Sequence, residues 1–260
     1  MAETDGSGSL GKKVFFLHPS ALIQNQIISE LAQEEFEVYI AKNETRLKHA
    51  LKKYPLSIVF ACINEGMKES AWEEWIRGVA GSSEISGLQI GIIASGNDEN
   101  VRSKYVDLLK VPCGYTAIKS DLSAVIKQLI GILNSVNAKG RRKYIRAITE
   151  RETNTTVNLP MNGTFINGSI KDISVVGFSC AFAEDPKLTK NSLFTDIQIR
   201  LQTQLLKVEG IVFGSRMDGE QKTYVILFTQ RIDPDIKTRI RKYIQYNLQS
   251  KIDDELKSTT

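Results

Sequence analysis

The first half of the chain alternates short apolar runs with amphipathic stretches, and this alternation constrains the fold more than any other feature. Five apolar runs are expected as strands, at residues 14–17, 36–40, 56–63, 89–94 and 115–118. Apolar residues recur at helical spacing in the stretches that follow them, at about residues 20–34, 44–53, 72–79, 99–109 and 122–137. Strands that alternate with helices build a parallel sheet covered on both faces. We therefore predict an α/β domain.

Five such repeats in about 125 residues resemble the receiver domain of bacterial response regulators, which implies a flavodoxin-like (βα)5 fold. The resemblance implies two acids after the first strand, a phosphoryl-accepting Asp after the third, Ser or Thr after the fourth and Lys after the fifth. The chain carries at these positions His18 and Pro19, Cys62, Ser95 and Lys119. Without carboxylates to hold Mg²⁺ and attack phosphorus, aspartyl-phosphate chemistry cannot proceed. We expect a degenerate receiver-like domain.

Each of these residues also has an ordinary structural interpretation. Cys62 fits a small buried hydrophobic residue better than a redox-sensing thiol. Ser95 and Lys119 are interpreted as a helix cap and a solvated charge, with a residual anion site as the alternative. His18 precedes a proline on a loop and indicates a surface residue rather than a ligand.

The second half has a different pattern, with short alternating runs separated by Gly and Asn. The expected strands are residues 155–159, 163–173, 177–182, 195–201, 206–213 and 223–230, with a hairpin turn at Asp218-Gly219. Short strands at this spacing predict an antiparallel β-barrel, and Asp233-Pro234 opens a C-terminal helix. The polar stretch 134–140 suits a hinge. We expect a disordered N-terminus at 1–11, domains at 12–138 and 139–252, and a frayed tail at 253–260.

Two motifs stand in order in the second half. Arg142-x-x-x-Arg146 lies at its start, and Asp172-x-Ser174-x-x-Gly177 follows Arg146 by 26 positions. Their conjunction in an all-β context resembles the PilZ domain, which implies binding of the bacterial second messenger cyclic di-GMP. The alternatives are a solvated linker face for the arginines and a plain turn for the second motif.

The resemblance implies a role for each motif residue. The expected ligand-binding residues are Arg141, Arg142, Arg146, Asp172, Ser174 and Gly177. Arginine grips a phosphate or the guanine Hoogsteen edge bidentately, and the preceding Arg141 would add a phosphate contact. Asp172 would accept from guanine N–H groups, Ser174 would contact phosphate or base, and Gly177 would leave room for ligand or an unusual turn.

The small net charge argues against a protein that coats the backbone of a nucleic acid. The net charge is only +4, with 15 basic and 16 acidic residues in 1–139 and the remaining 19 and 14 in 140–260. The positive excess lies in the second half, beginning at the arginine cluster, and no helix-turn-helix pattern accompanies it. A nucleic-acid-binding regulator and a scaffold that has lost nucleotide binding remain the competing functions.

Other features favour a non-enzymatic signalling protein. No nucleophile with a neighbouring His, no phosphate-binding loop and no metal-ligand spacing is visible, and the only histidines are His18 and His49. The three cysteines are far apart, which indicates a reducing compartment. No signal peptide or membrane-spanning run is seen. We expect a cytoplasmic cyclic di-GMP receptor without cofactor or membrane insertion that acts on an unidentified protein partner, in motility, attachment or related processes.

Overall fold

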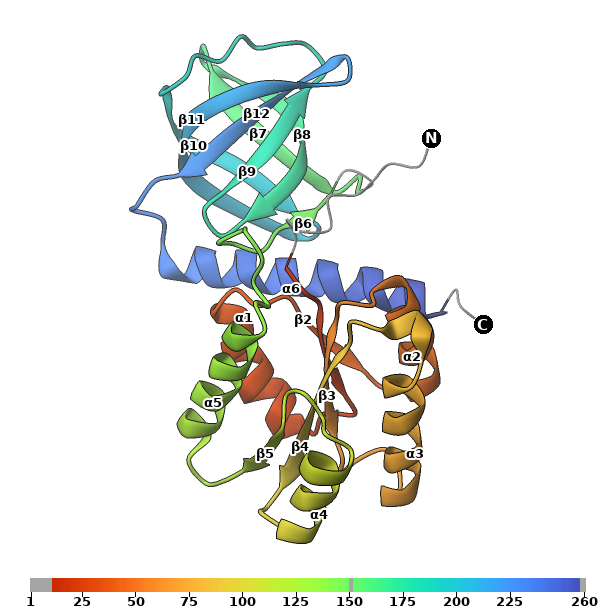
Figure 1. Ribbon diagram of the computed structural model, residues 1–260. Coiled ribbons are helices and arrows are strands. Elements are labelled where there is room, and N and C mark those ends of the chain that lie inside the picture. Colours follow the sequence, from red (N-terminus) through yellow and green to blue (C-terminus); the bar gives the residue numbers. More distant parts are fainter. Residues whose placement is uncertain (1–10, 150–151, 258–260) are drawn as a thin grey trace. The chain divides into compact units, whose positions relative to one another are not determined.

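The computed structural model of the protein describes residues 11–149 and 152–257, and these divide into two compact units (Figure 1). The first unit comprises residues 11–143 together with 248–257, and the second comprises Tyr144–Asn247. The disorder expected at the N-terminus falls almost entirely outside the described residues. The helix expected to complete the second domain therefore contributes residues to both units.

A parallel five-stranded sheet forms the centre of the first unit. Its strands are β1 (Val14–Leu17), β2 (Val38–Ala41), β3 (Ile58–Cys62), β4 (Gln89–Ser95) and β5 (Tyr115–Ile118), in the order β2-β1-β3-β4-β5. All pairings are parallel. Every residue of the central strand β3 is buried, as its apolar sequence predicts. The predicted α/β fold with a flavodoxin-like strand order is confirmed.

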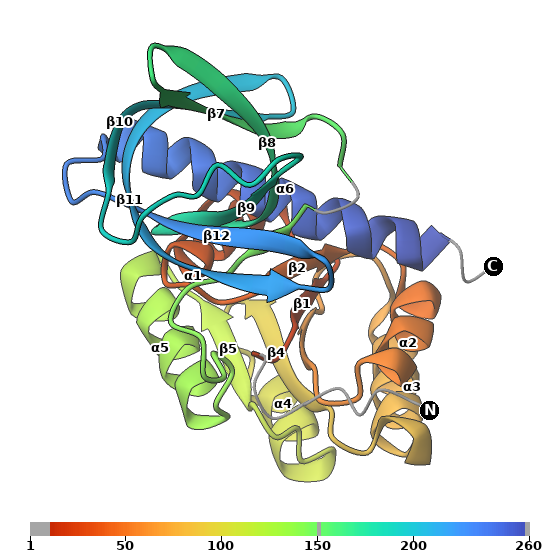
Figure 2. The ribbon, with the colours of Figure 1, turned by 90° about the horizontal axis from the view of Figure 1, so that it is seen from above.

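Helices cover both faces of this sheet. They are a π-helical turn (Ile23–Ile28) running into α1 (Ser29–Gln33), α2 (Glu44–Lys53), α3 (Glu69–Ala80), a 3-10 turn (Ser83–Ile85), α4 (Glu99–Ser103) with its π-helical continuation (Lys104–Leu108), and α5 (Leu122–Ser135). Helices α1 and α5 lie on one face, and α2 and α3 lie on the other (Figure 2). Their apolar side chains form the two cores that cover the sheet. Asn43, Asp98 and Asp121 cap α2, α4 and α5 by accepting from backbone N–H groups in the first turn.

An antiparallel barrel forms the second unit. Its strands are β6 (Ala147–Ile148), β7 (Thr155–Met161), β8 (Thr164–Ser174), β9 (Gly177–Phe182), β10 (Leu193–Leu201), β11 (Gln204–Asp218) and β12 (Gln221–Phe228). The sheet order is β6-β8-β7-β10-β11-β12-β9, and β8 also pairs with β9, so β7–β12 close into a ring (Figure 2). The predicted six-stranded barrel is confirmed. The two-residue strand β6 was not predicted, because two residues carry no periodicity.

Helix α6 (Pro234–Lys257) begins at the predicted proline, and the Asp233 carboxylate accepts from the backbone N–H of Asp235. The expectation that the chain frays from Asp253 is wrong. The helix continues to Lys257 because Ile252 and Leu256 are buried in the apolar core of the first unit.

Candidate functional site

The two sequence motifs of the second half meet at one ion pair. Arg146 Nη1 lies 3.0 Å from Asp172 Oδ1. The Asp172 side chain is only 11% exposed, whereas that of Arg146 is 41% exposed. A carboxylate that is nearly buried needs such a partner, since an unpaired buried charge is strongly unfavourable. The site therefore consists of a fixed acid and a basic group that faces solvent.

Strand β6 explains why Arg146 reaches Asp172. Ala147 and Ile148 pair with Ile173 and Asp172 of β8, so the residue that precedes β6 is brought beside the acid. The attachment continues at Thr149, whose backbone N–H donates to the Lys171 carbonyl at 2.8 Å. The entry segment of the second unit is thus fastened along β8.

Ser179 completes the environment of the acid and was missed by the sequence analysis. Its hydroxyl donates to Asp172 Oδ2, and the two residues lie opposite each other where β8 pairs with β9. The sequence did contain a signal for this contact. If a tight turn pairs Ser174 with Gly177, the strand register that follows from it places Asp172 opposite Ser179. Hydrogen bonds from both neighbours hold the carboxylate in a fixed orientation.

Ser174 and Gly177 lie at the turn between β8 and β9. The Ser174 hydroxyl donates to the Gly177 carbonyl at 3.1 Å and accepts from the Val176 N–H at 3.4 Å. A Cβ at Gly177 would lie 2.4 Å from the Ile226 carbonyl oxygen of β12, and the Gly177 φ lies outside the left-handed region. The space that glycine leaves is therefore taken by the neighbouring strand.

Arg141 and Arg142 belong to the first unit, where both side chains are exposed. They lie in the turn that follows α5, outside any helix. Of the three predicted arginines, the structure brings Arg146 to Asp172.

The carboxyl edge of the first unit's sheet holds a different set of contacts. His18 has a positive φ of 52° and a side chain only 15% exposed; its Nε2 lies 3.1 Å from Glu44 Oε2, and its ring packs edge-on to Trp72 at 5.8 Å. The interpretation of His18 as a surface residue is therefore wrong. A Cβ on Gly66 would lie 2.3 Å from the imidazole, so the ring fits against bare backbone. An imidazole with aromatic and carboxylate neighbours occupies the edge where a receiver would present acids.

The remaining candidates of that edge have structural roles. Cys62 is buried, and burial raises the pKa of its thiol, which opposes the reactive thiolate form. Ser95 does not cap α4, because Asp98 does so; instead its backbone N–H donates to Asn64 Oδ1 at 2.6 Å. Lys119 is exposed, as a solvated charge would be.

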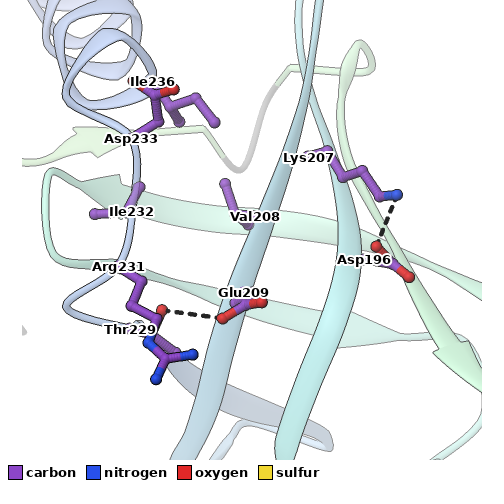
Figure 3. Close-up of a pocket in the computed structure, with 9 residues that line it drawn as sticks. All are labelled: Asp196, Lys207, Val208, Glu209, Thr229, Arg231, Ile232, Asp233 and Ile236. Atoms are coloured by element: carbon purple, nitrogen blue, oxygen red, sulfur yellow. Dashed lines mark hydrogen bonds and ion pairs between the residues drawn. The ribbon is translucent and has the colours of Figure 1, made fainter.

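A pocket of about 290 Å³ lies elsewhere in the second unit, lined by residues of β10, β11 and the start of α6 (Figure 3). Its charged groups are partly satisfied internally, since Lys207 pairs with Asp196 at 2.7 Å and Thr229 donates to Glu209 at 3.5 Å. None of the motif residues lines it. We therefore place the candidate site at Arg146 and Asp172.

Within residues 11–149 and 152–257, no group of three or more His, Cys, Asp or Glu side chains is arranged to hold a metal ion. No helix in these ranges combines the length and apolar character that crossing a membrane requires.

Residues 140–246 match the sequence model of the PilZ domain family. A search of curated proteins found no match. Among solved structures, the chain is similar to the PilZ domain of YcgR from Escherichia coli with c-di-GMP, with 14% identity, a TM-score of 0.37, and coverage of 46% of this chain and 99% of that one.

Longer solved chains give a similar picture. YcgR from Escherichia coli in complex with c-di-GMP has 14% identity and a TM-score of 0.39, over 47% of this chain and 52% of that one. The MrkH–c-di-GMP complex of K. pneumonia has 23% identity and a TM-score of 0.35, over 39% and 50%. This chain thus spans about half the length of these longer relatives. From the family match, together with the barrel and its terminal helix, we conclude that the C-terminal part of the chain carries a PilZ domain.

Proposed function

We propose that this chain is a non-enzymatic receptor for cyclic di-GMP, the ligand that the PilZ resemblance implies. The observation that carries the proposal is the contact of Arg146 with Asp172 at 3.0 Å, which joins the R-x-x-x-R and D-x-S-x-x-G motifs inside the segment that matches the family. Arg142 and Arg141, both exposed, would supply further cationic contacts.

The ligand presents two guanine edges and two phosphodiester anions, and Arg146 suits either. A guanidinium carries five N–H donors, and the contact with Asp172 uses Nη1. Because Arg146 is 41% exposed, its remaining N–H donors can reach a phosphate or guanine edge while Nη1 stays on Asp172. Asp172 is nearly buried, so a ligand that takes Arg146 away from it must supply hydrogen-bond donors in exchange.

Asp172 would recognise the guanine base by accepting hydrogen bonds from it. An ionised carboxylate has about four lone-pair sites, and Arg146 and Ser179 occupy two of them. The others can accept from guanine N1–H and N2–H₂. Ser174 and Gly177 would act through the turn that holds Asp172 against β9, since the Ser174 hydroxyl is bonded within that turn.

Ligand occupancy would be converted into a signal at the junction of the two units. The segment from Arg141 to Arg146 contains the boundary between them. Ordering this segment on a dianion would change the relative placement of the units and expose or hide a surface for a protein partner. Small-angle scattering with and without saturating ligand tests this step, and identical curves would contradict it.

Base selectivity tests the receptor assignment. Cyclic di-AMP carries the same charge but lacks the guanine N1–H and N2–H₂ donors. We expect cyclic di-GMP to bind at least about tenfold more tightly, since a site built to accept hydrogen bonds rejects a ligand without them. Asp172→Ala should lose this preference. Equal affinity for the two dinucleotides, or no binding of either, would refute the assignment.

A further inference from the structure

The entry segment that carries Arg146 ends at a carboxylate bound to helix α6. Glu152 lies six residues after Arg146, and its backbone N–H donates to the Thr149 carbonyl at 2.9 Å. Glu152 Oε2 accepts from the Tyr243 hydroxyl at 2.8 Å and from the Thr155 hydroxyl at 3.0 Å, and Oε1 accepts from Asn247 Nδ2. The position of Glu152 therefore depends on two residues of α6.

These donors are neutral and buried. Tyr243 and Asn247 are each 3% exposed. Buried donors need their acceptor, because an unsatisfied buried polar group is unfavourable. Displacement of Glu152 must therefore be accompanied by a rearrangement at this point of α6.

Two residues beyond Asn247, the same helix contacts the edge of the first unit's sheet. The Gln249 side-chain amide accepts from the Ile40 backbone N–H and donates to the Ile40 carbonyl, both at 2.9 Å. Ile40 lies on β2, an edge strand, whose outward backbone groups would otherwise lack a neighbouring strand. Tyr54 and Glu255 add a hydrogen bond of 2.7 Å, and Ile252 and Leu256 are buried in the adjoining core.

The helix contains no glycine or proline after Pro234, so the bonds of Asn247 and Gln249 lie within one uninterrupted helical turn. Only Leu248 separates the two residues along this helix.

We propose that Glu152 couples the ligand site to the β2 edge through helix α6. The proposal rests on the proposed function, because ligand occupancy is the input. When the dinucleotide draws Arg146 away from Asp172 and supplies guanine N–H donors in its place, the pairing of β6 with β8 shifts, Glu152 loosens its hold on Tyr243 and Asn247, and Gln249 releases Ile40. Glu152 is a positioning residue that does not touch ligand.

The Ile40 amide offers a direct measurement, because its N–H is bonded to Gln249. We expect saturating cyclic di-GMP to raise the amide exchange rate of Ile40 in the full chain about tenfold, with affinity measured in parallel by calorimetry. Glu152→Gln keeps the shape of the side chain, but its amide turns an N–H₂ group toward residues that donate hydrogen bonds to the Glu152 carboxylate. It should bind ligand within about threefold of wild type and lose the ligand-dependent change at Ile40.

Two control variants isolate the coupling. Gln249→Ala should raise Ile40 exchange with or without ligand while affinity is retained. Glu209→Gln alters a carboxylate outside the contact network of Glu152 and should behave as wild type. Thermal unfolding of each variant checks that it is folded.

The outcomes separate this proposal from the proposed function. If calorimetry shows binding but Ile40 exchange stays constant in the wild type, the coupling is wrong and the receptor assignment stands. If Glu152→Gln retains the response, Glu152 is not the coupling residue. Absence of cyclic di-GMP binding overturns both, and is recognised by the missing heat of binding.

Discussion

Replacement of Gly177 by alanine distinguishes two roles for the glycine of the second motif. From the sequence, the absence of a side chain at Gly177 was expected to leave space for ligand or for an unusual turn. In the structure, strand β12 occupies that space. An added Cβ would lie 2.4 Å from the Ile226 carbonyl oxygen and 2.9 Å from Leu227 Cα, against ordinary contacts of 3.4–4 Å. Both atoms are backbone, so β12 must move by about 1 Å to restore such a contact.

Overpacking of this kind destabilises by about 1–3 kcal/mol. For a domain of about 100 residues each kcal/mol lowers Tm by about 4–8 °C, so Gly177→Ala should unfold the second unit roughly 4–24 °C below wild type. Thermal unfolding followed by circular dichroism measures the shift, and amide exchange in β9 and β12 locates it. The shift should persist without any ligand.

Gly214 provides the matched control. It lies in β11 of the same barrel, and a Cβ there would meet nothing within 4 Å. Gly214→Ala should stay within about 0.5 kcal/mol of wild type. If Gly177→Ala unfolds like wild type yet loses cyclic di-GMP binding, the glycine serves the ligand and the argument from strand approach is wrong.

Three further predictions follow from named contacts. Ser179→Ala removes a hydrogen bond to the Asp172 carboxylate and should lower the unfolding free energy of the second unit by about 1.5–3 kcal/mol in urea titrations, while Ser179→Thr keeps it; equal stability of both variants would contradict this. Burial raises the pKa of Glu255, but the hydrogen bonds from Tyr54 and Lys53, together with the charge of Lys53, outweigh it and hold the pKa below its ordinary 4.5. The stabilisation is therefore present above pH 4.5 and lost as pH falls through the folded-state pKa, so amide protection at the end of α6 should drop in acid, and Glu255→Gln should flatten that dependence. Cys62 should resist alkylation by iodoacetamide at pH 8 until the chain is unfolded, and rapid labelling of the native protein would refute its burial.

Most of the fold could be predicted from apolar residues that recur every two positions, as in a strand, or about every 3.6 positions, as in a helix. Strand β5 and the start of α6 were predicted to the residue, because apolar periodicity and a proline after Asp233 mark them locally. The C-terminal end of α6 was not predicted, because apolar periodicity identifies the apolar face of a helix but not the residues against which that face packs. Ile252 and Leu256 pack against a core whose other buried residues all lie at Val111 or earlier in the sequence.

The site was predicted in part for the same reason. The resemblance of the two motifs to the PilZ signature implied that Arg146 and Asp172 belong to one site, and the structure joins them through β6. The roles of Ser179 and Gly177 depend on strand register, which fixes cross-strand neighbours that no linear motif states. The contacts of Glu152 with α6 join residues about 90 positions apart and leave no local signal.

The central claim is that Arg146 and Asp172 form a cyclic di-GMP site, and calorimetric titration of the full chain tests it most directly. Arg77→Ala, which breaks an Arg–Glu ion pair in the first unit, controls for loss of a cation. The account predicts saturable binding by wild type and Arg77→Ala, and about 5- to 150-fold weaker binding by Arg146→Ala, equivalent to about 1–3 kcal/mol. Arg146→Lys should also bind weakly, because it lacks the planar fork. Undiminished affinity in Arg146→Ala would contradict the account.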